Sequence, residues 1–449
     1  MRILIRSAEI VDPASPFHGQ RKDILVEDGV IRRVGEGAET GVDYRLEGAG
    51  RYVSTGWVDM RVSAKDPGQE QKEDLSSVVR AAAAGGFTEI AVLPNTQPVV
   101  QTKEAIAYQK RAGERGPVRI HPIAAVTLNH AGKELTEMID LHRAGAVAFS
   151  DGTVPLWHAD VFVKTLQYLQ PLGGLLINRP EDPMLTRYGT MNEGLTSTML
   201  GLKGMPKLAE ELMLMRDLAL LEYVTEPDGR TLPKERCEAA RDGRTPDGPG
   251  NVVLHFSLIS TARSVALIRE AKRNGWPVSC DVAAHQIAFH DSALVDFDTN
   301  LKVNPPFRSP EDVAALWEGL ADGTIDAIVS DHNPQDEESK KLEFDLAEFG
   351  VIGLETAFAV VNTHNPGLPL FRLVEKLTTQ PRRILRLPPP RIEEGQPANL
   401  TFFDAHVEWT FTEADIRSKS GNSPFIGHRF KGRPLATMIN GQLSIIVDQ

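Results

Sequence analysis

Acidic and imidazole side chains stand at the ends of several short apolar runs in this sequence. Asp151, His255 and Asp331 each end or closely follow such a run. Carboxylate oxygens and imidazole nitrogens bind hydrolytic divalent metals, so these residues are candidates for a metal site. A single Asp or His at such a place usually caps a loop or helix. Three of them, after three different runs, favour a site or the remains of one.

The apolar runs alternate with amphipathic stretches from about residue 53 to residue 390. Eight runs are predicted as strands: Val53–Met60, Thr88–Leu93, Arg119–Ala125, Ala146–Phe149, Gly174–Ile177, Asn251–His255, Pro277–Asp281 and Asp326–Val329. The helical stretches between them include Glu73–Ala84, Thr102–Arg115, Pro206–Tyr223, Thr261–Asn274 and Pro310–Ala321. This alternation predicts an α/β protein with a closed (β/α)8 TIM barrel, in which the carboxyl ends of the strands meet. A doubly wound open sheet is the alternative, although no GxGxxG motif follows the first strand.

The two ends of the chain have a different pattern. Residues 1–52 and 391–449 contain short apolar or alternating runs separated by turn residues, which is typical of β-strands. Because chain termini often lie close together, we expect both ends to form one small β-sandwich domain beside a barrel over residues 53–390. The segment Val224–Gly250 is rich in Pro, Gly and charged residues. It is predicted to be a solvated loop, and a partner contact is the alternative.

Composition excludes several classes of function. The 449 residues include 49 Lys and Arg and 61 Asp and Glu, a formal net charge of −12, so a nucleic-acid partner is not expected. No apolar stretch reaches the roughly 18 residues that a membrane helix needs. The two cysteines, Cys237 and Cys280, form neither a disulfide framework nor a CxxC zinc pair. We therefore expect a cytoplasmic protein without a membrane anchor.

Seven short motifs, spread over most of the chain, follow one pattern. They are Trp57–Met60, Asp66–Gly68, Leu93–Pro98, Phe149–Gly152, Lys302–Arg308, Ser330–Pro334 and Phe349–Thr356. In these motifs the chain resembles the bacterial type I dihydroorotases of the amidohydrolase superfamily. The resemblance implies the same barrel with a terminal β domain, and a place in pyrimidine biosynthesis. Family members hydrolyse the amide of a cyclic ureide with a metal-bound hydroxide.

The resemblance also implies which positions would hold the two metal ions. The family uses an HxH pair after the first strand, a carboxylate after the fourth, histidines after the fifth and sixth, and Asp after the eighth. The retained ligand positions are Asp151, His255 and Asp331, and the lost ones are Arg61, Ser63 and Asn178. A catalytic zinc usually has three protein ligands, and a guanidinium keeps its charge at neutral pH and repels a dication. We therefore expect no metal cofactor, although zinc serves the active relatives.

The substrate-binding positions implied by the resemblance are partly kept. Lys65 replaces the family's carboxylate-binding arginine and so loses the bidentate fork. Asn95 and Asn304 remain at substrate-contacting positions, whereas Gln335 replaces the last histidine of the DHxPH motif. For His285, an ordinary loop role is at least as well supported as ligand contact.

Three functions are compatible with these residues. The first, which we favour, is a catalytically inactive dihydroorotase-like protein that serves as a structural or regulatory partner of aspartate transcarbamoylase. In this function Asp331 is a vestigial general base, and the chain is expected to form homo-oligomers. The second is an active dihydroorotase or related cyclic amidohydrolase with a reduced metal site. The third is a sensor that holds a small anionic ligand at Lys65, Asn95 and Asn304 without turning it over.

Overall fold

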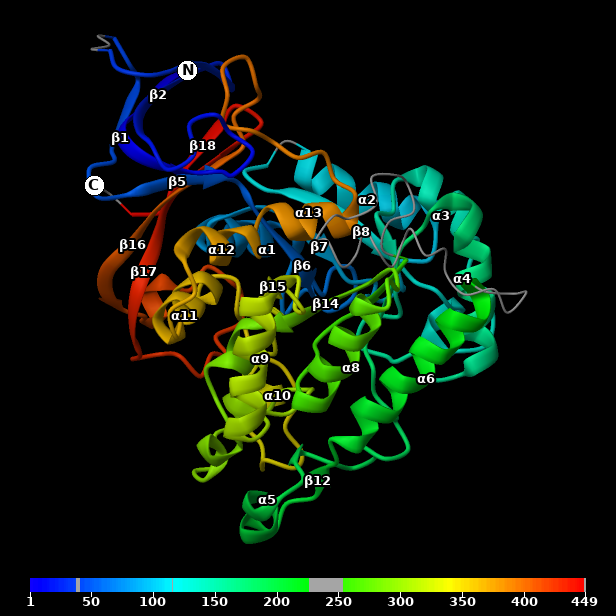
Figure 1. Cartoon of the computed structure of the whole chain (residues 1–449). Helices are drawn as coiled ribbons and strands as arrows, with labels where there is room; N and C mark the ends of the chain where they lie inside the picture. The colour runs from blue at the N-terminus through cyan, green and yellow to red at the C-terminus, as the bar shows by residue number, and fades with distance from the viewer. Residues whose placement is uncertain (38–40, 115, 226–252, 448–449) are drawn as a thin grey trace.

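The computed structural model describes residues 1–37, 41–114, 116–225 and 253–447. Eight parallel strands from the middle of the chain form one sheet, in the order β15-β14-β13-β10-β9-β8-β7-β6. They are β6 (Trp57–Val62), β7 (Phe87–Val92), β8 (Arg119–Ala124), β9 (Ala148–Phe149), β10 (Leu176–Asn178), β13 (Leu254–Phe256), β14 (Val278–Ala283) and β15 (Ala327–Val329). A parallel bridge between Val62 and His332 joins the end of β6 to the segment after β15. The sheet therefore closes almost completely, and the predicted TIM-barrel fold is confirmed (Figure 1).

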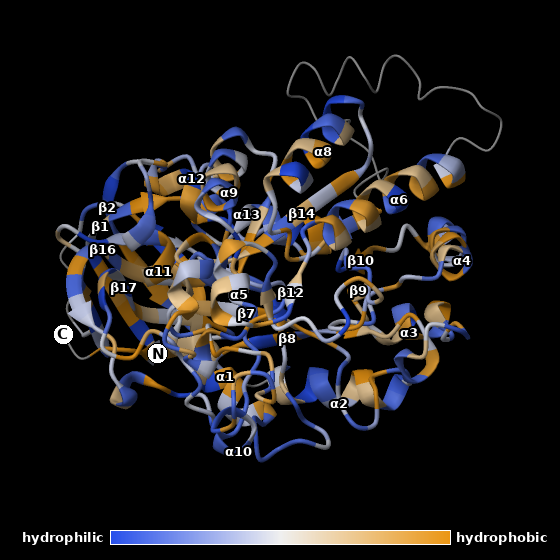
Figure 2. Ribbon diagram, turned by 90° about the horizontal axis from the view of Figure 1, so that it is seen from below, coloured by the Kyte–Doolittle hydropathy of each residue, from blue (hydrophilic) through white to orange (hydrophobic). Residues whose placement is uncertain are grey.

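Helices surround the strands. They are α1 (Leu75–Ala84), α2 (Lys103–Glu114), α3 (Met138–Ala144), α4 (Ala159–Leu169), α5 (Leu195–Leu200), α6 (Leu208–Thr225), α8 (Ala262–Arg273), α9 (Pro310–Asp322), α10 (Glu337–Lys340), α11 (Ala357–His364), α12 (Leu370–Glu375) and α13 (Thr379–Leu385). Side-chain caps fix where several of them begin: Asp74 accepts from the first turn of α1, and Thr261 accepts from Ser264 of α8. From below, α2, α3, α4, α6 and α8 lie outside the strands (Figure 2).

The barrel strands are buried on both faces. Every residue of β6, β7 and β14 is buried, as parallel strands between a packed interior and a layer of helices must be. Alternate residues such as Val58, Ala91 and Ile123 form one apolar cluster, whereas Trp57 and Phe87 pack with the helices in another. Polar side chains that could do chemistry are therefore concentrated at the strand ends.

The first predicted strand, Val53–Met60, is in fact two strands. Strand β5 (Tyr52–Thr55) pairs with strands of the terminal sheet, and β6 begins at Trp57. Gly56 lies between them because a Cβ there would lie 2.0 Å from Asn399 Oδ1 and 2.1 Å from Thr88 Oγ1. The segment Val224–Gly250 lies outside the described residues, apart from its first two, which end α6.

Strands from both ends of the chain form a second sheet. They are β1 (Arg2–Val11), β2 (Arg21–Glu27), β3 (Val30–Val34), β4 (Tyr44–Glu47), β5, β16 (Leu400–Thr410), β17 (Arg429–Ile439) and β18 (Gln442–Ile445). The order is β18-β17-β16-β5-β1-β2-β3, with β4 on β1, so antiparallel pairing of β5 with β16 joins the two ends (Figure 1). The domain limits at residues 52 and 391 remain a prediction. Among the described residues, no helix is long and apolar enough to span a bilayer.

Candidate functional site

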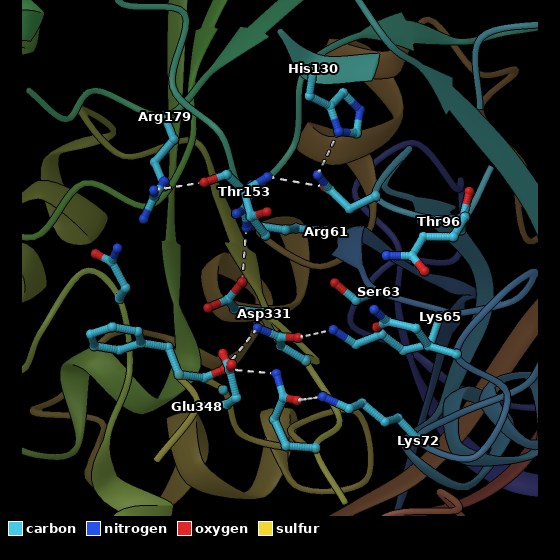
Figure 3. Close-up of a pocket in the computed structure, with 18 of the residues that line it drawn as sticks. Arg61, Ser63, Lys65, Lys72, Thr96, His130, Thr153, Arg179, Asp331 and Glu348 are labelled. Carbon is cyan, nitrogen blue, oxygen red and sulfur yellow. Dashed lines mark hydrogen bonds and ion pairs between the residues drawn. The ribbon is translucent and has the colours of Figure 1, made fainter. Parts of the chain in front are cut away.

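A cavity of about 570 Å³ opens at the carboxyl ends of the barrel strands. Its polar wall combines residues that follow β6, β7 and β15 with others from the longer loops (Figure 3). Six of the residues predicted to form the site line this cavity: Arg61, Ser63, Lys65, Asn95, Asn304 and Asp331. The other three, Asp151, Asn178 and His255, are buried and do not line it.

Arg61 and Asp331 form a buried ion pair at the position of the expected metal site. Arg61 Nε donates to Asp331 Oδ1 over 2.8 Å, and the two side chains are 3% and 13% exposed. Arg61 Nη1 also donates to Ser257 Oγ at 3.3 Å, and the Arg61 backbone N–H donates to Asp59 Oδ1 at 2.9 Å. Burial raises the pKa of Asp59 to about 6. The guanidinium therefore occupies one oxygen of Asp331 and places a positive charge beside the carboxylate that would otherwise meet a metal ion.

Asp151 and His255 are fully engaged with neighbouring protein groups. Asp151 Oδ1 accepts from the backbone N–H groups of Val126 and Thr127 at 2.9 and 3.0 Å, and its Oδ2 accepts from Thr127 Oγ1 at 2.5 Å. Burial is the main cause that raises the pKa of Asp151. His255 uses Nδ1 to contact Ser279 Oγ at 2.7 Å and Nε2 to contact Asp281 Oδ2 at 2.8 Å. Both of its ring nitrogens are thus in hydrogen bonds.

Asn178 has a structural partner for each end of its amide. Its Oδ1 accepts from the backbone N–H of Leu156 at 3.0 Å, and its Nδ2 donates to Asp217 Oδ2 at 2.7 Å. Burial raises the pKa of Asp217 to about 6, and Arg216 forms an ion pair with the same carboxylate. The amide thus links β10 to the loop before α4 and to α6 rather than facing a ligand.

These residues do not fit a pair of catalytic metal ions. A donor set needs three or more side chains whose free lone pairs converge on one point. In the described part of the chain, no three His, Cys, Asp or Glu side chains are grouped in that way. Arg61 also places a permanent positive charge beside Asp331, where a dication would otherwise be stabilised.

The predicted substrate-binding residues reach the cavity, and each has a protein partner. Lys65 Nζ donates to Asn333 Oδ1 at 2.7 Å, and burial lowers its pKa to about 8. Asn95 accepts from the backbone N–H of Thr153 at 3.0 Å and donates to the Asp151 carbonyl at 3.1 Å. These contacts hold the polar wall in place before any ligand binds.

Asn304 and Gln335 also line the cavity, and each has a protein partner. Asn304 Nδ2 donates to Glu181 Oε2 at 3.1 Å, and Gln335 Oε1 accepts from Lys72 Nζ at 2.6 Å. His285 does not line the cavity. Its ring packs against that of Phe307 with centroids 5.8 Å apart, and burial lowers its pKa to about 4.

Sequence reasoning assigned no role to several residues of the cavity wall, among them Lys72, His130 and Arg179. Arg179 follows β10 directly, so its position after a barrel strand could have identified it. Its Nη2 donates to the Thr153 carbonyl and pairs with Glu181 Oε2, both at 2.7 Å. His130 ends a short 3-10 helix (Leu128–His130), and burial lowers its pKa to about 4, so the ring is neutral at pH 7.

The amidohydrolases share this architecture. They have a parallel barrel with a polar cavity at the strand ends, joined to a sheet from both ends of the chain. L-hydantoinase from Arthrobacter aurescens has the same fold, with a TM-score of 0.79 at 22% identity over 100% of this chain and 98% of that chain. A D-hydantoinase structure has a TM-score of 0.78 at 20% identity, covering 99% and 95% of the two chains. Residues 227–444 match the amidohydrolase family, and residues 50–225 match the dihydro-orotase-like family.

Full-length relatives identify the family more closely. The dihydroorotase of Pelotomaculum thermopropionicum is 41% identical over 99% of this chain and 98% of its own length. The dihydroorotase of Geotalea daltonii is 37% identical over 99% of both chains. The chain therefore belongs to the dihydroorotase family, and it is a dihydroorotase-type protein of pyrimidine biosynthesis.

Proposed function

We propose that this chain is a dihydroorotase homologue whose own cavity does not carry out metal-assisted hydrolysis, and that it serves as a structural or regulatory subunit. The observation that carries the proposal is the 2.8 Å ion pair between Arg61 and Asp331. In the family, the aspartate after the last barrel strand acts as general base beside the metal-bound hydroxide. Here that carboxylate accepts a hydrogen bond from a guanidinium, which keeps its proton at neutral pH.

The other former ligand positions support the same conclusion. His255 has both ring nitrogens in hydrogen bonds, and Asp151 accepts from three donors. Recruiting either for a metal would break contacts between groups that are at most 1% exposed, and leaving buried donors unpaired costs about 1–3 kcal/mol each. Without a metal ion, water keeps a pKa of about 15.7 and supplies little hydroxide at neutral pH.

The second candidate is an active dihydroorotase that converts dihydroorotate to carbamoyl aspartate with a reduced metal site. The comparisons alone support it better than the inactive reading, because full-length relatives at 41% and 37% identity are named dihydroorotases. The arrangement around Arg61 supports the first candidate. The two differ in a single measurable property, which is turnover.

Turnover of dihydroorotate by the purified full-length chain, with and without added zinc, separates the two candidates. The Pelotomaculum thermopropionicum relative serves as the reference enzyme. We expect no turnover above background in either condition. Zinc-dependent turnover that disappears in Asp331→Asn would overturn the proposal and establish the active enzyme.

The proposed partner is aspartate transcarbamoylase, on the basis of the family resemblance. Exposed apolar side chains on α6 support a contact with another protein chain. Leu208, Leu212 and Met215 are 49%, 41% and 37% exposed and lie at helical spacing on one face. Leu195 and Met199 of α5, the preceding helix in the chain, are 77% and 78% exposed.

Sizing chromatography of this chain with the transcarbamoylase of the same organism tests the partner. We expect a joint peak that is lost in the double variant Leu212→Glu, Met215→Glu. The matched control is Leu346→Glu, which changes an exposed leucine on a different segment. Separate elution of the two unmodified proteins at micromolar concentration would contradict this part of the proposal.

A further inference from the structure

We propose that two loops at the carboxyl end of the barrel form a docking surface for a protein segment that presents lysines or arginines around an apolar anchor. The first loop, residues 295–298, lies between β14 and α9, and the second, residues 341–348, follows α10. We call these two segments the acidic loop surface. It goes beyond the proposed function, because the transcarbamoylase contact is proposed on α6.

Contacts beneath the surface hold the two loops together. The rings of Phe297 and Phe344 pack edge to face with centroids 6.3 Å apart, and Thr299 Oγ1 donates to the Lys340 carbonyl at 2.7 Å. The buried Lys302 donates from Nζ to the Phe344 carbonyl at 2.7 Å. The two loops therefore lie side by side and form one continuous surface.

Four large apolar side chains of the acidic loop surface are exposed. Val295 and Phe297 are 53% and 43% exposed, and Leu342 and Leu346 are 45% and 67% exposed. Single exposed apolar residues are ordinary, whereas a group of them on adjacent loops marks an interaction site. Phe297 also has a φ of +57°, a left-handed conformation that is unfavourable for a bulky residue. Backbone strain of this kind is concentrated at functional sites.

Five exposed carboxylates belong to the same two loops. They are Asp296, Asp298, Glu343, Asp345 and Glu348. No ion pair joins any of them to another residue in the described part of the chain. Lys341, the exposed basic residue of these loops, pairs with Glu337 at 2.7 Å. The ammonium groups of Lys302 and Lys340 lie beneath the surface and donate to main-chain carbonyls. The exposed face therefore carries an excess of negative charge.

This charge selects the kind of partner. Protein interfaces combine an apolar centre with a polar rim, and complementary charge across them favours the correct pairing. A basic segment with an apolar anchor matches both features, because its anchor covers the four apolar side chains while its cations meet the unpaired carboxylates. A second copy docked face to face would bring five more carboxylates against these five, and an anionic membrane would be repelled as well.

Calorimetric titration of the full-length chain with three synthetic peptides of about 18 residues tests this surface. The first, of Leu and Lys, is patterned as an amphipathic helix, the second has the same residues in scrambled order, and the third has Glu in place of Lys. We expect the patterned Leu/Lys peptide to bind about tenfold or more tightly than the other two, and more weakly at high salt. Equal affinity for the patterned and scrambled peptides would overturn the proposal.

A variant without a change of charge tests the apolar part of the surface. Leu342→Ser, Leu346→Ser should weaken binding of the patterned Leu/Lys peptide about tenfold. The matched control is Val407→Ser, Ile445→Ser, which changes two side chains of the terminal sheet that are 38% and 44% exposed. The control should bind as the unmodified chain does. Unchanged affinity in the loop variant would overturn the proposal.

A second pair of variants separates local carboxylates from the overall negative charge. Asp296→Asn, Asp345→Asn should weaken binding of the same peptide about tenfold. The control Glu114→Gln, Glu318→Gln removes the same net charge from exposed positions of α2 and α9 and should have a much smaller effect. Equal weakening in both variants would mean that the peptide is attracted by the whole acidic chain, which contradicts a defined surface.

Sizing chromatography excludes the other occupants. Leu342→Ser, Leu346→Ser should elute as the unmodified chain does and should keep the joint peak with the transcarbamoylase. A smaller species would show that the loops join copies of this chain, and a lost joint peak would assign them to the transcarbamoylase contact. Either result would overturn the proposal. Failure of the peptide experiments leaves the proposed function standing, because its tests depend on the cavity and on α6.

Discussion

Arg61 donates from Nε to Asp331 Oδ1 over 2.8 Å, which joins the end of the first barrel strand to a residue two positions after the last strand. The two residues are 270 positions apart in sequence. Asp331 adopts a left-handed backbone conformation with φ of 48°, which is unfavourable for residues other than Gly. The ion pair therefore stabilises the closure of the barrel at the point where the family places its metal.

Replacing Arg61 with Met should destabilise the fold strongly. The change leaves the Asp331 carboxylate without its cation, and breaking a buried pair in this way costs about 3–5 kcal/mol. The double variant Arg61→Met, Asp331→Asn should recover most of the loss, because no unpaired charge remains. Urea unfolding at pH 7 measures both. A single variant as stable as the unmodified chain would show that the pair contributes nothing.

Restoring the three imidazoles should create zinc binding. In the triple variant Arg61→His, Ser63→His, Asn178→His, the guanidinium no longer opposes a dication and Asp331 becomes free to bind it. Zinc content after dialysis, measured by mass spectrometry, should rise well above that of the unmodified chain. The control carries Gln at the same three positions. Equal zinc in both triple variants would mean that the histidines do not form the site.

Gly152→Ala should disturb the cavity wall. Gly152 has a φ of +65°, and a Cβ there would lie 1.7 Å from Asn95 Oδ1. Asn95 would have to move, losing its bonds to Thr153 and Asp151, at a cost of about 1–3 kcal/mol. Gly323→Ala is the matched control, because its φ is +84° and nothing lies within 4 Å of the added Cβ. Thermal unfolding should show a larger loss for Gly152→Ala than for the control.

The free energy of unfolding should rise with pH above neutrality, in part because of Lys340. Burial, and then the nearby Lys302 charge, lowers the Lys340 pKa from 10.5 to about 7, while Asp298 and Glu348 oppose the shift. Between these values the unfolded chain binds more protons than the folded chain. Raising the pH therefore favours the folded state, by at most about 1.4 kcal/mol per pH unit for one group.

The variant Lys340→Met isolates this contribution. Lys340 donates to the carbonyls of Glu348 and Gly350, so the absolute stability will change as well. The expected result concerns the slope, which should be smaller in the variant between pH 7 and pH 9. Urea unfolding at several pH values measures it. Parallel curves for the two proteins would contradict the lowered pKa.

The amino-acid sequence by itself determined the barrel and which residues follow the carboxyl ends of its strands. Alternating apolar runs and amphipathic stretches require parallel strands covered by helices, and the residue after each run then lies at a known end. The departures from the family's ligand pattern at Arg61, Ser63 and Asn178 were implied by the resemblance to the family's motifs and not by the apolar pattern. The break between β5 and β6 at Gly56 could not be predicted in this way. The contacts that require a glycine there come from Asn399 and Thr88, which are far away in sequence.

Only the tertiary structure decided what these side chains contact. The sequence does not show that Arg61 and Asp331 meet, because barrel closure brings them together. Loop conformation likewise brings Arg179 into the cavity. The engagement of both His255 nitrogens depends on Ser279 and Asp281 of the adjacent strand. Pattern and register are local properties of a chain, whereas hydrogen-bond partners depend on packing between distant segments.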